Sequence, residues 1–347
     1  MSAQAVRPAL LLLGGTLPGN WQVVSKVQKN PQSSGGNFSE GYIVESTSGQ
    51  RAYLKALDLS QALEPGIPDP IGMINVLTEA FLFERNLLER CRSTRLDRVV
   101  TAIDSGTIGA SPNDLVFYLV FELADGDVRE QMEVARRIDV AWSLRTLHQI
   151  AVALKQLHSQ HIAHQDVKPS NVLLFGQRGC KVADLGRAVQ RGSIPPHENY
   201  KVAGDKSYAP PELLFGHLLP DWTERRIGCD IYLLGSMVVS LFTGIGMSHL
   251  LIAHLQEEHK PTRWQGTYEE VLPFVVEAFG RAIEMVAAHV DPRVSSQVCR
   301  IVRELCDPDP ARRGHPVEYA RRGNQYSLER YITNFDLLAR RAELEAF

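Results

Sequence analysis

The pattern of hydrophobic and polar positions changes near residue 125. Before it, short apolar runs such as residues 52–57 are separated by Gly, Ser and Asn, which is typical of strands joined by tight turns. Residues 99–102 and 115–121 form two more strand-like runs. Apolar positions at helical spacing between residues 76 and 91 indicate one amphipathic helix. The first part of the chain is therefore predicted to be rich in strands.

Helical spacing dominates the second part of the chain. Its clearest helix carries an apolar face made of Leu144, Leu147, Ile150, Leu154 and Leu157. Residues 172–183 interrupt the helices with a predicted hairpin. Residues 231–242 are the most apolar segment, but a bilayer span needs roughly 20 residues. We therefore expect a buried helix there, an amphipathic helix over residues 327–347, and no membrane span.

Two segments stand outside this pattern. Residues 63–70 are rich in Pro, which helices and central strands do not tolerate, so they are predicted to form a surface connection. The sequence leaves open whether this connection docks a regulatory protein partner. Near the N-terminus, residues 9–13 are apolar and follow Arg7, but the run is short and lacks a convincing signal-peptide cleavage site. Residues 1–20 are interpreted as an N-terminal extension.

Composition narrows the class of protein. The chain has 347 residues, of which 44% are hydrophobic, so it can bury one large core or two modest ones. A net charge of -3 with dispersed Lys and Arg favours neither nucleic acid nor anionic lipid as a partner. The five cysteines are scattered and odd in number, with no C-x-x-C pair. We expect a reducing compartment and a cytoplasmic location.

Candidate chemistry gathers around the predicted hairpin. Asp166 and Asn171 lie in a loop that enters its first strand, and Asp184 ends its second strand, so the three side chains can converge. Transfer of a γ-phosphoryl group needs a metal at the phosphates, a cation at their flank and a carboxylate beside the incoming hydroxyl. An Asp and an Asn near a helix end can also be simple caps. The spacing favours a phosphate and metal site.

Residues 164–171 read His-Gln-Asp-Val-Lys-Pro-Ser-Asn, which resembles the H-R-D-L-K-P-x-N loop of eukaryotic-type (Hanks-type) serine/threonine protein kinases. Asp-Leu-Gly at residues 184–186 is similar to the D-F-G motif of that family. The resemblance implies an α+β class and a bilobal protein kinase fold. It places a small β-rich N-lobe at 21–123, a larger helical C-lobe at 124–335 and a helical tail at 336–347.

The same resemblance assigns roles to residues of the catalytic loop. Asp166 would act as the base or orienting group for the substrate hydroxyl, and Lys168 would steady the γ-phosphate. Asn171 and Asp184 would hold Mg²⁺ through hard oxygen ligands. The expected cofactors are ATP and Mg²⁺, and the expected partners are protein substrates.

Nucleotide contacts are expected in the first part of the chain. Lys55 resembles the strand lysine that contacts the α- and β-phosphates. Its acidic partner is assigned to Glu84 in preference to Glu79, because two apolar residues follow Glu84 at the family's spacing. Gly35 and Gly36 fall where the family has its Gly-rich loop, in which glycine lets backbone N–H groups approach phosphate. A Gly-Gly-Asn sequence is also common in ordinary turns.

Residues 121–124 resemble the hinge that binds adenine through its backbone, which brings in Glu122 and Ala124. Asp127 would accept hydrogen bonds from the ribose hydroxyls. Further on, three residues resemble architectural positions of the family. They are Glu212 with its expected ion-pair partner Arg313, and Asp230, which would accept hydrogen bonds from the catalytic-loop backbone.

Two positions depart from the family pattern. Gln165 replaces the arginine that in many kinases grips a phosphorylated activation loop through bidentate bonds. Activity is therefore predicted not to depend on phosphorylation of that loop. Asp205 replaces a threonine that touches the catalytic Asp and Lys, so it could pair with Lys168 or repel Asp166. Lys168 favours serine/threonine acceptors, because tyrosine-specific members usually lack this lysine.

Three functions compete at this stage. The favoured one is an ATP-dependent serine/threonine protein kinase. A catalytically weak pseudokinase or nucleotide-binding scaffold would be indicated by loss of Lys55, Asp166, Asn171 or Asp184, and all four are present. A small-molecule kinase, such as an antibiotic phosphotransferase, shares the fold, but Lys168 and the motifs near residues 211 and 230 resemble the protein-kinase pattern.

Overall fold

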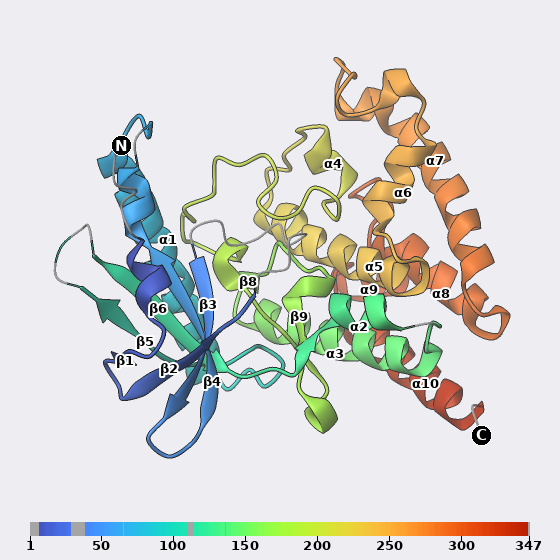
Figure 1. Cartoon of the computed structure of the whole chain (residues 1–347). Coiled ribbons are helices and arrows are strands. Elements are labelled where there is room, and N and C mark those ends of the chain that lie inside the picture. Colours follow the sequence, from blue (N-terminus) through green and yellow to red (C-terminus); the bar gives the residue numbers. More distant parts are fainter. Residues whose placement is uncertain are drawn as a thin grey trace. The chain divides into compact units, whose positions relative to one another are not determined.

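The computed structural model describes residues 7–28, 39–64, 66–109, 111, 114–135 and 137–345 (Figure 1). The chain divides into two compact units, Met1–Asp125 and Gly126–Phe347. The N-terminal unit is rich in strands and the C-terminal unit is mostly helical, as the change of pattern near residue 125 predicts. The expected α+β class with a β-rich N-lobe and a helical C-lobe is confirmed.

An antiparallel sheet of six strands forms the N-terminal unit, in the order β1-β2-β3-β4-β6-β5. The strands are β1 (Thr16–Leu17), β2 (Trp21–Lys26), β3 (Ser39–Ser46), β4 (Arg51–Asp58), β5 (Ala102–Ile108) and β6 (Val116–Glu122). Successive side chains of a strand point to opposite faces. In β4, Ala52, Leu54 and Ala56 therefore enter the hydrophobic core, while Lys55 lies on the other face.

One long helix, α1 (Pro70–Ser93), and two short 3-10 helices, η1 (Pro8–Leu11) and η2 (Leu59–Leu63), complete the unit. The start of α1 was expected at residue 76 and lies earlier. Asp69 caps the helix by accepting the N–H of Gly72 at 2.9 Å, and proline is well tolerated at the first helical position. The connection expected over residues 63–70 therefore ends at Asp69, because Pro70 already belongs to the helix. Phe81 of α1 stacks on Phe117 of β6, with ring centroids 4.7 Å apart.

The strand expected at residues 99–102 is displaced along the sequence. Only Ala102 belongs to β5, which continues to Ile108. Asp104 and Gly106 lie inside this strand, and these residue types are depleted in strands, so they hide its pattern. The residues before β5 still pair, because Thr101 N–H donates to Glu122 Oε1 at 2.9 Å.

The C-terminal unit contains helices and two small sheets. Its strands are β7 (Gly126–Asp127), β8 (Ile162–Ala163), β9 (Val172–Leu174), β10 (Cys180–Val182) and β11 (Val189–Gln190), in the orders β10-β9-β7 and β11-β8. Its α-helices are α2 (Val128–Val134), α3 (Val140–Ser159), α4 (Pro211–Leu214), α5 (Gly228–Thr243), α6 (Met247–His254), α7 (Tyr268–His289), α8 (Pro292–Leu305), α9 (Pro316–Arg322) and α10 (Glu329–Glu345). The predicted hairpin is confirmed as β9 and β10, whose residues pair in antiparallel register.

Short helical turns connect these elements. They are η3 (Pro169–Asn171), η4 (Gly176–Arg178), η5 (Leu185–Arg187), η6 (Thr223–Ile227), which is a π-helix, and η7 (Glu257–His259). The continuous helical stretch Thr223–Thr243 is long and apolar enough to cross a membrane, but 94% of its most apolar window is buried inside the protein. The expected buried helix is thus confirmed as α5, around which α3, α7 and α8 pack.

The apolar face expected in α3 is confirmed, because its four leucines and Ile150 are all fully buried. Helix α10 packs along α3, as Figure 1 shows. Arg145 of α3 contacts Asp336 at 2.6 Å and Glu343 at 2.8 Å, so charged pairs flank this contact. The predicted border between residues 335 and 336 lies within α10.

Candidate active site

Asp230 anchors the loop between β8 and β9. Its carboxylate is fully buried and accepts hydrogen bonds from the backbone N–H groups of His164 at 2.7 Å and Gln165 at 2.8 Å. His158 Nε2 lies 2.8 Å from the same carboxylate. Burial alone would raise the pKa of Asp230, but these bonds and the neighbouring histidines hold its pKa below the ordinary value. An ionised carboxylate thus fixes the loop, as expected for this residue.

Three side chains expected in catalysis meet in this loop. Asn171 Nδ2 donates to the backbone oxygen of Asp166 at 2.8 Å and to its Oδ2 at 3.0 Å. Lys168 Nζ lies 3.3 Å from Asp166 Oδ2. Burial raises the pKa of Asp166, the Lys168 ammonium opposes this, and the Asp184 carboxylate adds to it. The loop therefore presents one carboxylate beside one cation.

Asp184 follows β10 and is tied to the same loop through the hairpin. Ala183 N–H donates to Asn171 O at 2.8 Å, and His164 Nε2 lies 3.0 Å from Ala183 O. Asp184 adopts a left-handed backbone conformation with φ 63°, which is uncommon for a residue other than glycine. Strain of this kind clusters at functional sites.

The residues present fit a magnesium ion. Because the Asn171 nitrogen is used by Asp166, the atom that Asn171 can offer to a metal is its carbonyl oxygen. Asp184 adds a carboxylate whose charge is felt at Asp166. Among the described residues, no group of three His, Cys, Asp or Glu side chains could hold a metal by itself. Mg²⁺ is usually bound by one or two carboxylates together with waters and substrate phosphates.

Asp205 joins the cluster, which settles the alternatives left open above. Its backbone N–H donates to Asp166 Oδ1 at 2.8 Å, and its carboxylate lies 3.5 Å from Lys168 Nζ. Asp205 thus pairs with Lys168 and supports Asp166. Gly204 makes this approach possible, because a Cβ there would lie 2.6 Å from Asp166 Oδ1. Sequence reasoning assigned no role to Gly204, although its place directly before Asp205, where the family has a threonine, was a usable signal.

In the N-terminal unit, the expected pair of Lys55 and Glu84 is confirmed. Lys55 Nζ of β4 lies 2.9 Å and 3.0 Å from the two carboxylate oxygens of Glu84 on α1. Glu84 is buried, whereas Glu79 is exposed, so the choice between these two acids is also confirmed. The buried carboxylate orients the lysine side chain through both of its oxygens.

The remaining nucleotide contacts stay predictions. Glu122 ends β6, and its side chain accepts the N–H of Thr101. Ala124 is partly buried in the segment that follows. Asp127 caps α2 by accepting the Glu130 N–H at 2.8 Å, and burial raises its pKa. Gly35 and Gly36 lie outside the described residues.

The architectural pair expected in the C-terminal unit is also present. Arg313 has no exposed side-chain surface and donates to both oxygens of Glu212, at 2.7 Å and 2.8 Å. Its guanidinium lies 5.1 Å from the ring centroid of Tyr232. Such a bidentate buried pair fixes structure and takes no part in chemistry.

With this geometry in place, comparison with known proteins is decisive. The chain matches the protein kinase domain over residues 36–321, which is most of its length. The chain belongs to the protein kinase family. Its fold is accordingly the bilobal protein kinase fold, with the Lys55–Glu84 pair in one unit and the Asp166 cluster in the other.

Individual relatives are distant from this kinase. An Aurora kinase of Debaryomyces hansenii is 30% identical over 128 residues, which cover 37% of this chain and 30% of that protein. The serine/threonine-protein kinase PrkC of Bacillus subtilis is 32% identical over 152 residues, which cover 42% of this chain and 22% of that protein. The chain therefore matches less than a third of the length of either relative.

Proposed function

We propose that this kinase transfers the γ-phosphoryl group of ATP to serine or threonine hydroxyls of protein substrates. The observation that carries the proposal is the environment of Asp166, whose carboxylate is held by Asn171, Lys168 and the backbone of Asp205. A pseudokinase has no need to keep a base, a cation and an amide group at these mutual distances. Family membership supports the transferase class, and the similarity to the serine/threonine-protein kinase PrkC supports serine/threonine specificity.

In the proposed reaction, each of these residues has a separate role. Asp166 accepts the proton of the substrate hydroxyl as its oxygen bonds to the γ-phosphorus and the bond from that phosphorus to the leaving ADP oxygen breaks. Lys168 donates to the γ-phosphoryl oxygens, whose charge shifts during transfer. Lys55, oriented by Glu84, binds the α- and β-phosphates. Mg²⁺ held by Asn171 and Asp184 would neutralise the phosphate charge.

Lys168 favours serine or threonine as acceptor. In the family motif that residues 164–171 resemble, a lysine two positions after the catalytic Asp is typical of serine/threonine kinases. Asp205, at the usual threonine position, lies 3.5 Å from Lys168 and leaves that lysine 3.3 Å from Asp166. The substitution is therefore compatible with the serine/threonine arrangement.

The decisive experiment supplies labelled ATP and Mg²⁺ with a mixture of generic proteins and, separately, small-molecule alcohols. We expect label on protein serine or threonine with the wild type, and a loss on the order of a thousandfold with Asp166→Asn. Asp291→Asn is the matched control, because asparagine caps α8 as well as aspartate does. Label on small molecules alone, on tyrosine alone, or on nothing would contradict the proposal.

A further inference from the structure

A glutamate of the activation segment, residues 184–212, is held by two arginines from outside that segment. Glu198 Oε2 accepts from Arg226 Nη2 at 2.6 Å, and Glu198 Oε1 lies 3.1 Å from Arg225 Nη1. Arg225 and Arg226 belong to η6, the π-helical turn that precedes α5. Arg226 is buried, while the Glu198 side chain is 37% exposed. Each carboxylate oxygen thus has its own guanidinium.

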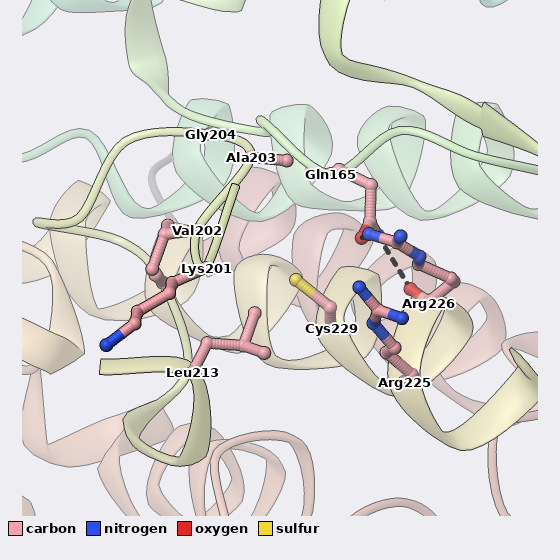
Figure 2. Close-up of a pocket in the computed structure, with 10 residues that line it drawn as sticks. Gln165, Lys201, Val202, Ala203, Gly204, Leu213, Arg225, Arg226 and Cys229 are labelled. Atoms are coloured by element: carbon pink, nitrogen blue, oxygen red, sulfur yellow. Dashed lines mark hydrogen bonds between the residues drawn. The ribbon is translucent and has the colours of Figure 1, made fainter. Parts of the chain in front are cut away.

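The arginine that holds Glu198 is bonded to the catalytic loop. Gln165 Nε2 donates to the backbone oxygen of Arg226 at 2.8 Å, and Arg226 Nη1 lies 3.4 Å from Gln165 Oε1. Figure 2 shows the Gln165 side chain pointing toward Arg226. Gln165 itself has a left-handed φ of 67° and precedes Asp166. An unbroken chain of bonds therefore runs from Glu198 through Arg226 to the residue beside the catalytic aspartate.

The cavity beside these residues is too small for a separate anionic ligand. It is lined by Val202, Ala203, Leu213 and Cys229 together with the arginines, and its volume is about 10 Å³, enough for roughly one water molecule (Figure 2). The guanidinium groups there already have a carboxylate. The arrangement fits a built-in acid better than a site that waits for phosphate.

Other bonds tie the activation segment to the strand just before the catalytic loop and to the loop itself. At the start, β11 pairs with β8, and Arg191 N–H donates to His161 O at 2.9 Å. Near the end, Asp205 N–H donates to Asp166 Oδ1. Glu198 lies between these anchors, so its contact with Arg225 and Arg226 fixes the middle of the segment.

We propose that Glu198 is a positioning residue for phosphoryl transfer, which holds the activation segment against the Gln165–Arg226 pair without phosphorylation. In this arrangement, a permanent carboxylate takes the part of a phosphate, and Arg226 takes the part of the arginine missing at position 165. A carboxylate accepts charge-assisted bonds from two guanidinium groups as a phosphate does, although with less charge. The proposal rests on the proposed kinase function.

The test compares Glu198→Gln with Glu277→Gln, which removes the charge of an exposed pair with Arg281 on α7. All proteins are treated with phosphatase first. We expect Glu198→Gln to lower kcat about tenfold or more with the KM for ATP within about twofold, because ATP contacts are untouched. Amide hydrogen exchange over residues 191–204 should become faster in this variant, and Glu277→Gln should match the wild type in both measurements.

Chemical rescue separates positioning from general loss of structure. Glu198→Ala leaves a gap that solvent reaches, so added acetate should restore part of its kcat, which a variant that is merely unfolded would not show. If kcat of Glu198→Gln equals that of the wild type, the proposal is overturned. Should the wild type transfer no phosphate at all, the proposed function fails, but hydrogen exchange still decides: unchanged exchange in Glu198→Gln overturns the structural role, and faster exchange supports it.

Discussion

At the scale of single residues, the position of Asp166 depends on Gly204, which has no side chain. Its carboxylate is held by Asn171 and Lys168 from its own loop and by the Asp205 N–H from the activation segment. The last contact requires the backbone at Gly204 to pass against Asp166 and the preceding carbonyl. Any side chain at Gly204 would push the segment away.

We therefore predict that Gly204→Ala lowers kcat by about tenfold or more, since a Cβ would lie 2.6 Å from Asp166 Oδ1 and displace the Asp205 N–H. Steady-state kinetics and thermal unfolding check this. Gly280→Ala is the control, because a Cβ there has open space and alanine favours the helix by about 1 kcal/mol. Equal kcat in Gly204→Ala and the wild type would contradict the assignment.

Sequence alone predicted that the residues of the Asp166 cluster converge, but not how their neighbours support them. Asp166 and Asn171 share a short loop with fixed spacing, so their convergence is a local property. The bond from Gln165 to Arg226 joins positions 61 residues apart, and no spacing rule predicts it. Left-handed conformations at Gln165 and Asp184 likewise result from tertiary contacts, since neither residue type requires them.

At the scale of elements, strand and helix periodicity together place Lys55, the lysine proposed to bind phosphate. In β4, alternation puts Lys55 on the face opposite the core residues Leu54 and Ala56. Helix α1 then brings Glu84 to it from a buried position, while Glu79 remains outside. With 3.6 residues per turn, the two acids, five residues apart, lie about 140° apart around the helix, which is why only one can pair.

Glu84→Gln is predicted to lower kcat/KM for ATP about tenfold or more, because Lys55 loses the charge that orients it. Glu79→Gln removes an exposed acid from the same helix and should leave the kinetics unchanged. Both variants keep the helix, since glutamine and glutamate have similar helix propensity. Equal effects of the two substitutions would show that the charge of α1, and not this ion pair, matters.

Elements were predicted well where their pattern was regular and poorly where a special residue intervened. Helix α3 and the β9–β10 hairpin follow their periodicities closely. In the sequence, Pro70 suggests the end of a helix. In the structure, it is the first residue of α1. In β5, the ring of Tyr118 from β6 packs closely on Gly106, which explains the glycine within this strand. The alternation of apolar and polar residues does not reveal such a contact.

At the scale of the whole molecule, charged pairs between distant positions hold the C-terminal unit together. Arg313 and Glu212 lie 101 positions apart and are both buried. Removing one partner of such a pair costs about 3–5 kcal/mol, because the other charge stays buried. The family resemblance predicted this pair, whereas nothing in the sequence predicted Glu198 with Arg226. Motifs thus reveal the shared framework and miss what is particular to this chain.

Stability of this unit is predicted to depend on pH through His197, which is 3% exposed and lies beside Glu198 in the activation segment. Burial and the charges of Arg187 and Arg226 lower its pKa from 6.5 to about 4, against an opposing effect of Glu198. The unfolded chain therefore binds a proton at higher pH than the folded chain does. Between these two pKa values, the free energy of unfolding falls as the pH falls.

From pH 7 to pH 5, the His197 contribution amounts to a loss of about 2 kcal/mol. Denaturant unfolding at both pH values, followed through the C-terminal unit, should show this loss in the wild type and a flatter dependence in His197→Gln, which cannot bind the proton. His289→Gln removes an exposed histidine and should keep the wild-type dependence. If His197→Gln loses as much stability as the wild type between pH 7 and pH 5, another group governs the response and His197 is protonated in the folded state.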